Sequence, residues 1–260
     1  MSIANEVRIP PNGLFGQLRM PNDLQSPRGC CLFVHGLTRG QGQFERAADM
    51  LCEQGFASLR FDSRGRGQSE GVFTLRNMID DIRHGLSFLR SAWPSTPLAM
   101  VARGEGAYCS IMATWRVSMS AKIFWAPIFY PRTSRERQGH MHEFRQRGFA
   151  VLRLSPEEQY WMGKEFLNDL DAHDDAWNFV NSEDRLLVVH PAADAISPVE
   201  YVNEFLDQIN PRLVIPAALE LLDARPHPHV DKNFPSAYET ATLRFLGEVI
   251  SLSKGSDKCI

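Results

Sequence analysis

The sequence predicts an α/β fold with a doubly wound, mostly parallel sheet. Apolar runs of strand length alternate along the chain with segments whose apolar residues recur at helical intervals. This alternation implies parallel strands joined by right-handed crossovers, with helices on both faces of the sheet. The 260 residues are 43% hydrophobic, which is enough to bury a sizeable core in one large domain or in one domain with an insertion.

Six apolar runs predict the strands of this sheet: "GCCLFVHG" (29–36), "ASLRFD" (57–62), "PLAMVA" (97–102), "AKIFWAPI" (121–128), "DRLLVVHP" (184–191) and "ALELLDA" (218–224). Five segments with helical spacing predict the helices between and after them: 43–56, 77–92, 105–115, 198–209 and 236–252. In the first helix, Phe44, Ala47 and Leu51 share one face and Gly55 ends the helix. In the second, Ile82 and its neighbours at helical intervals form the apolar face.

The alternation of strands and helices breaks between residues 129 and 183. This segment is richer in charged and aromatic residues, and its pattern predicts helices and loops. We therefore expect a core made of 1–128 and 184–260, with 129–183 inserted over the top of the sheet as a lid.

Composition and charge exclude several classes of function. The formal net charge of −3 predicts no strong attraction to nucleic acid or to an anionic membrane. The five cysteines are odd in number and lack the spacing of a zinc site. Three of them, Cys31, Cys52 and Cys109, lie in apolar or helical contexts, so we expect these to be buried free thiols and the protein to be in a reducing cytosol. The start of the sequence lacks the pattern of a signal peptide, and no stretch is long enough to span a bilayer. No motif predicts a metal, a dinucleotide or a phosphate loop, so no cofactor is expected.

Three motifs follow three consecutive predicted strands. "VHGLTRG" (34–40) forms a tight bend that points backbone N–H groups into the crevice at the carboxyl end of its strand. "FDSRGRGQSEG" (61–71) has an aspartate at the strand end and glycines that permit close backbone turns. "PLAMVARGEGA" (97–107) is an apolar strand followed by a glycine corner and a helix of small residues.

In this order and spacing the motifs resemble those of the α/β-hydrolase family, over nearly the whole chain except 129–183. The similarity is closest to lidded serine esterases and aminopeptidases, which carry His-Gly-Phe/Leu-Thr, Phe-Asp-x-Arg-Gly-x-Gly-x-Ser and Gly-x-Ser-x-Gly. A weaker likeness is to hydrolase-like proteins linked to bacterial exopolysaccharide and exosortase systems, some of which have altered elbows. The resemblance implies an α/β-hydrolase sheet with a helical lid, and esters, thioesters or amides as the substrate class of an active member.

The resemblance places a nucleophile at the glycine corner, where a strained turn lifts one side chain above the sheet. Aligned without gaps, the position of the nucleophile is Gly104, and the small flanking residues are Ala102 and Gly106. Glycine has no side chain that can attack a carbonyl carbon. Moving the tip to Glu105 puts Arg103 where only a small residue fits.

The other parts of the family's catalytic site have candidates in this sequence. "HPAADAISP" resembles the loop that supplies the acid, which makes Asp194 the predicted acid. The family's histidine follows the last strand, which points to His227, with His229 as the alternative base. By position, the oxyanion hole uses the backbone N–H groups of Leu37 and Glu105. Backbone donors persist whatever side chain replaces the nucleophile.

The side chain of Glu105 complicates this pocket. A carboxylate repels an anion, and Arg103 is the predicted neighbour that can offset its charge. The sequence does not show which way either side chain turns.

Three hypotheses of function follow. Because loss of the nucleophile costs about 10⁶-fold in turnover in such enzymes, the first is a protein without covalent catalysis whose pocket holds a small-molecule acyl or carbonyl ligand. The second is an active hydrolase. Either the natural protein carries a serine that has been replaced in this sequence, or His227 and Asp194 activate water without a covalent step. The third is a partner-binding protein that uses the aromatic residues of the lid, namely Phe129, Tyr130, Tyr160, Trp161 and Trp177. The oligomeric state and the identity of the ligand are open.

Overall fold

The fold is built on an eight-stranded sheet with the order β1-β2-β4-β3-β5-β6-β9-β10. The computed structural model describes residues 3–21, 26–38, 40–153, 159–170, 176–223 and 235–253. All neighbouring strands from β4 to β10 are parallel, whereas β1 pairs with β2, and β2 with β4, in antiparallel fashion. The predicted α/β fold with a mostly parallel sheet is confirmed.

The six predicted strands are present as β3 (Gly29–Val34), β4 (Phe56–Phe61), β5 (Leu98–Gly104), β6 (Ala121–Pro127), β9 (Leu186–Pro191) and β10 (Ala218–Leu222). The first five are buried at every residue, because helices cover both faces of the sheet. The edge strand β10 is largely accessible.

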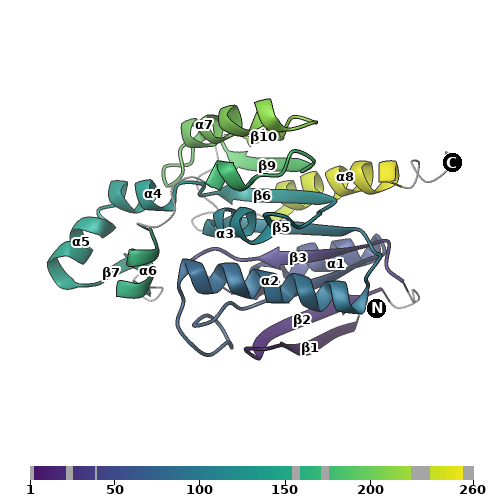
Figure 1. Cartoon of the computed structure of the whole chain (residues 1–260), viewed down its shortest axis with the longest axis horizontal. Coiled ribbons are helices and arrows are strands. Elements are labelled where there is room, and N and C mark those ends of the chain that lie inside the picture. Colours follow the sequence, from purple (N-terminus) through teal and green to yellow (C-terminus); the bar gives the residue numbers. More distant parts are fainter. Residues whose placement is uncertain are drawn as a thin grey trace.

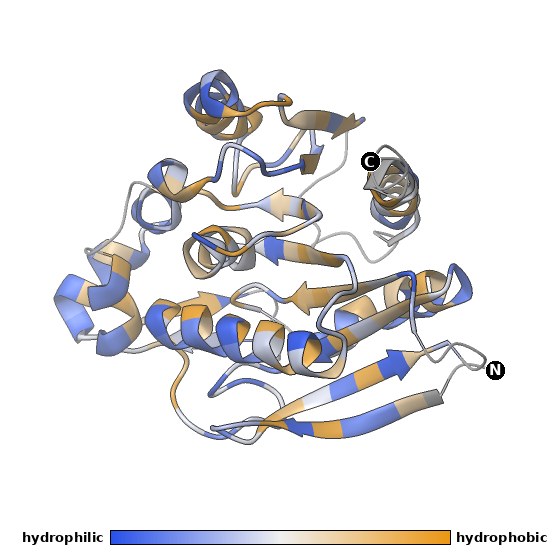
Figure 2. Ribbon diagram, turned by 45° about the vertical axis from the view of Figure 1, so that its right-hand side comes forward, coloured by the Kyte–Doolittle hydropathy of each residue, from blue (hydrophilic) through white to orange (hydrophobic). Residues whose placement is uncertain are grey.

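The predicted helices are also present: α1 (Glu45–Glu53), α2 (Leu75–Ala92), α3 (Glu105–Thr114), α7 (Val199–Ile209) and α8 (Pro235–Ser253). Helix α1 follows a short 3-10 turn, η1 (Gln41–Phe44). Helices α1 and α8 pack against one face of the sheet, and α2, α3 and α7 against the other, so the core has two apolar layers (Figure 1). Figure 2 shows hydrophobic residues concentrated on the central strands and mixed with hydrophilic ones on the helices.

Two hairpins were not among the predicted elements. At the sheet edge, β1 (Ile3–Ile9) pairs with β2 (Leu14–Met20). Inside 129–183, where only helices and loops were predicted, β7 (Ala150–Arg153) pairs with β8 (Gln159–Met162). Strands of four residues are too short to show an alternating pattern, and that prediction was wrong for this reason.

The rest of 129–183 is helical in its described residues. It contains α4 (Pro131–Arg137), α5 (His140–Arg147), α6 (Lys164–Leu170) and the 3-10 turn η2 (Ala176–Phe179). Figure 1 shows α4, α5, β7 and α6 gathered at one end of the molecule, beside the sheet. Helix α4 begins shortly after the end of β6, and this short connection places residues of α4 next to the glycine corner.

Cys31, Cys52 and Cys109 are buried and form no disulfide within the described residues, as predicted for these three, and the same holds for Cys30. Burial raises the pKa of Cys30 to about 12, so its thiol is protonated at neutral pH.

Within the described residues, no group of three or more His, Cys, Asp or Glu side chains is arranged to hold a metal ion. No described helix has the length and apolarity needed to cross a membrane.

Candidate functional site

The predicted sharp corner is present between β5 and α3. Gly104 has φ +54° and ψ −128°, a conformation that glycine adopts without steric cost from a Cβ atom. A Cβ placed there meets only the Cα of Gly36, at 3.8 Å, so a side chain at this position has open space. At Gly106 the opposite holds, because a Cβ lies 2.5 Å from the carbonyl oxygen of His35. The corner therefore requires a small residue after its tip and leaves the tip itself bare.

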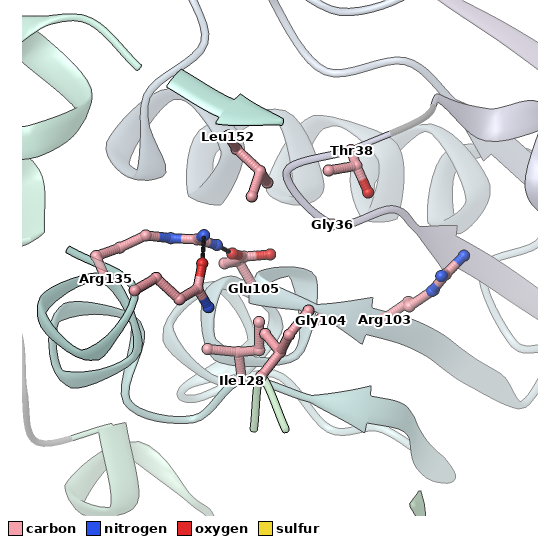
Figure 3. A pocket seen from close by; sticks show the side chains of 10 residues that line it. Gly36, Thr38, Arg103, Gly104, Glu105, Ile128, Arg135 and Leu152 are labelled. Carbon is pink, nitrogen blue, oxygen red and sulfur yellow. Dashed lines mark hydrogen bonds and ion pairs between the residues drawn. The ribbon is translucent and has the colours of Figure 1, made fainter. Parts of the chain in front are cut away.

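The carboxylate of Glu105 is hydrogen-bonded to one of the backbone N–H groups that were predicted to form the oxyanion hole. Its Oε2 accepts a hydrogen bond from the backbone N–H of Leu37 at 3.2 Å, and the residue is only 3% exposed. The other carboxylate oxygen forms an ion pair with the guanidinium of Arg135 (Figure 3). A carboxylate of this chain thus sits at the N–H group that the sequence predicts as an oxyanion donor.

Arg135 extends from α4 into the core and is 2% exposed. Its Nη1 donates to Oε1 of Gln138 at 3.0 Å, and no described residue accepts a hydrogen bond from its Nε. Burial lowers the pKa of Arg135 to about 10, so the guanidinium remains charged at neutral pH. Each member of this ion pair needs the other, because a buried charge without a counter-charge strongly destabilises the fold.

The sequence left open whether Arg103 offsets the charge of Glu105. In the structure, the guanidinium of Arg103 donates to the side chain of Gln43 and points away from Glu105 in Figure 3. The cation comes instead from Arg135, thirty positions further along the chain (135 − 105). No motif marks Arg135 in the sequence, because its role depends on how 129–183 folds back onto the corner.

His35 fixes the loop that carries the Leu37 donor. Its Nε2 accepts the N–H of Ser63 at 2.9 Å, so its Nδ1 carries the proton and donates to the carbonyl oxygen of Gly36 at 2.7 Å. Burial lowers the pKa of His35, which keeps the ring neutral. Arg66 holds the next peptide, because its Nε donates to the carbonyl oxygen of Leu37 at 3.1 Å.

Asp62 explains one glycine in each of the first two motifs, Gly40 and Gly67. Its carboxylate accepts the backbone N–H groups of Gln41 at 2.8 Å and Gln68 at 3.1 Å. A Cβ at Gly40 or Gly67 would lie 2.1 Å from one of its oxygens. Both loops therefore close tightly around one carboxylate, beside the corner.

Asp194, the predicted acid, is buried in the loop after β9. Its Oδ1 accepts the N–H groups of Ile196 at 2.8 Å and Ser197 at 3.0 Å, and its Oδ2 lies 4.0 Å from Nε2 of His190. The hydroxyl of Ser197 donates to the carbonyl oxygen of Pro127 at 2.8 Å, which ties this loop to the end of β6.

The two predicted histidines, His227 and His229, lie outside the described residues. The structure brings Gly104, Glu105 and the N–H of Leu37 together. The Asp194 loop reaches the same place through Ile196, which lines the cavity next to Gly104.

This cavity has a volume of about 20 Å³, which is room for about one water molecule. Its walls come from the Gly36–Thr38 loop, the corner, α4, β7 and the loop after β9.

Comparisons with solved structures agree on the fold. Est1E from Butyrivibrio proteoclasticus, in a structure with ferulic acid bound, is 20% identical, with a TM-score of 0.78 over 95% of this chain and 100% of that one. An esterase from Pyrococcus furiosus is 20% identical, with a TM-score of 0.68 over 95% of this chain and 91% of that one. A serine hydrolase without a lid from Xanthomonas campestris is 20% identical, with a TM-score of 0.62 over 95% of this chain and 94% of that one.

No curated protein sequence matches the chain. The family described as serine aminopeptidase, S33, matches residues 25–165, more than half of the 260 residues, and the match includes all three motifs and the corner at Gly104. The chain is therefore a member of the serine aminopeptidase S33 family, with the α/β-hydrolase fold.

Proposed function

We propose that this protein is a member of its family without covalent catalysis, and that its site over Gly104 binds a small molecule through a carbonyl or carboxylate group. The observation that carries the proposal is the corner itself, where a bare backbone at φ +54° stands at the position that the resemblance assigns to the nucleophile. Without an attacking side chain, no acyl-enzyme forms.

The position of Glu105 supports the same proposal. Acyl transfer needs backbone donors that are free to receive the developing negative oxygen, and one such donor is worth about 10²–10³-fold in rate. Here the N–H of Leu37 is already bonded to a carboxylate. The same bond supports oxygen binding at this place, since an oxygen of this chain already occupies it. Ferulic acid, the ligand of the Est1E structure, is itself a carboxylic acid.

Hydrolysis by an activated water is the second candidate, and the cavity favours it. A space of about 20 Å³ beside Gly104 holds one water, and His227 with Asp194 would act as its base. Such an enzyme loses its rate on His227→Ala and resists fluorophosphonate probes.

Partner binding through 129–183 receives less support from the described side chains. Phe129 is buried and stacks on Phe205 with ring centroids 3.8 Å apart, and Tyr130 packs against Trp177 at 6.1 Å. Trp161 is 63% exposed, whereas Tyr130, Tyr160 and Trp177 are partly buried and pack against the core.

The decisive experiment compares the wild type with Gly104→Ser and with Gly104→Ser/Glu105→Leu/Arg135→Met. Replacing a buried ion pair by apolar residues of similar volume is often neutral for stability, so the triple variant frees the Leu37 donor without leaving a lone charge. We measure hydrolysis of p-nitrophenyl acetate and butyrate, and labelling by a fluorophosphonate. The wild type should show no turnover, Gly104→Ser little, and the triple variant about 10²-fold more than Gly104→Ser.

Glu105→Leu/Arg135→Met without the serine is the matched control and should be inactive. Turnover by the wild type above the buffer rate, abolished by His227→Ala, would overturn the proposal in favour of the activated water.

A further inference from the structure

Glu105 is held in the way that proteins hold a bound carboxylate ligand. One oxygen accepts a backbone N–H at 3.2 Å, and the other pairs with a guanidinium that is 2% exposed. The residue also opens α3, a helix of ten residues whose N-terminus favours negative charge. A charged donor, a neutral donor and a helix end therefore converge on one carboxylate.

The cation of this site has a second anchor besides Glu105. Arg135 comes from a different segment, is anchored by Gln138, and has an Nε that no described residue satisfies. His35, on the loop that carries the Leu37 donor, is kept neutral by burial and adds no positive charge. Without the glutamate, the site is a buried planar cation beside a free N–H, which is complementary to a planar anion.

We propose that the site over Gly104 is a carboxylate-binding site whose resident ligand is the chain's own Glu105, and that a small external monocarboxylate takes the same place when Glu105 leaves it. This inference rests on the proposed function and names its ligand class. Because the resident carboxylate is tethered, it competes at a high effective concentration. A ligand of the wild type must therefore add contacts beyond its carboxylate.

The chemistry of the side chain provides a direct test. Glu105→Ala removes a CH₂–COO⁻ group, and acetate restores the same atoms without the covalent link. We measure the melting temperature of Glu105→Ala at pH 7 in increasing sodium acetate, at constant ionic strength maintained with sodium chloride. Acetate at ten times its Kd should raise the melting temperature by about 3 °C. Acetamide, which has the same shape but no charge, should not.

Two further proteins serve as controls. The wild type, whose site is filled, should show no shift at the same acetate concentrations. Glu105→Ala/Arg135→Met, which lacks the cation, should also show none, although it folds at least as well as the single variant. A shift of equal size in acetamide, or in the variant without Arg135, would contradict the proposal, as would no shift in acetate up to 50 mM.

If Glu105→Ala is isolated unfolded, the refolding yield is the measurement. Recovery in acetate but not in chloride supports the proposal, and no recovery in acetate while Glu105→Ala/Arg135→Met refolds overturns it. This result is separate from the proposed function. Ester hydrolysis by the wild type refutes the absence of catalysis, whereas a failed rescue by acetate refutes only the ligand class.

Discussion

At the scale of single residues, Gly106 has a constraint that can be measured. A Cβ at this position lies 2.5 Å from the carbonyl oxygen of His35, and backbone cannot yield as a flexible side chain does. We expect Gly106→Ala to lower the free energy of unfolding by about 1–3 kcal/mol in urea titrations. Gly42→Ala is the control, because a Cβ there has no neighbour within 4 Å, and it should change stability by less than about 0.5 kcal/mol. Equal losses of stability in the two variants would contradict the steric constraint proposed for Gly106.

His35 should make stability depend on pH. Burial lowers its pKa in the folded state, so the unfolded chain binds the proton more readily. Its contribution is complete above the unfolded pKa of about 6.5 and is lost as the pH falls below that value, at up to about 1.4 kcal/mol per pH unit. Asp62 opposes this shift and Arg66 adds to it. His140, whose pKa burial lowers to about 4, contributes a loss of the same sign.

The check is urea unfolding at pH 7 and pH 5 for the wild type and His35→Gln. The variant should lose less stability between the two pH values than the wild type. His142→Gln changes an exposed histidine and should lose as much as the wild type. An unchanged pH dependence in His35→Gln would show that the neutral ring is not the cause.

At the scale of elements, an ion pair joins the start of β6 to the turn before β9. Nζ of Lys122 lies 2.6 Å from Oδ2 of Asp184, both residues are buried, and the same oxygen accepts the N–H of Asn181 at 3.0 Å. Asp184→Asn leaves a buried ammonium without its counter-charge and should cost about 3–5 kcal/mol in urea unfolding. Lys122→Met/Asp184→Leu should recover most of that loss. A single variant as stable as the wild type would mean that the pair contributes nothing.

The strands that could be predicted from the sequence are those that are buried on both faces of the sheet. β3, β5 and β6 are covered on both faces, so all their residues except Arg103 and Lys122 are apolar or small, and a largely apolar run marks each strand. β1 lies at the sheet edge and is mostly accessible, so its sequence carries no such run. The hairpin of β7 and β8 is too short for any periodic pattern.

In the candidate site, too, some residues could be predicted from the sequence and others could not. The Gly104 corner and the Leu37 donor could be predicted because local backbone geometry dictates the residue types around them. Arg135 could not, because nothing near it in sequence records that α4 lies over the corner. The position of Glu105 was predicted, but its role as the occupant of the donor follows only from the folded arrangement.

At the scale of the whole molecule, the thiols report on global unfolding. The four cysteines among the described residues are buried, and burial raises the pKa of Cys30, Cys31 and Cys109. Because the thiolate is the reactive form, Ellman's reagent at pH 8 should reach these sulfurs only through opening of the core. Mass spectrometry of the labelled peptides should give rates that rise with urea in parallel for the four sites. Labelling of any of them within seconds in native buffer would contradict this prediction.

The backbone at Gly104 has a wider consequence. Any residue other than glycine at φ +54° and ψ −128° holds its main chain under tension, at a cost on the order of 1–3 kcal/mol. In this chain the same corner is relaxed. The fold around the corner therefore has no such backbone cost to offset, and the buried guanidinium that enters from α4 is balanced by the carboxylate of Glu105.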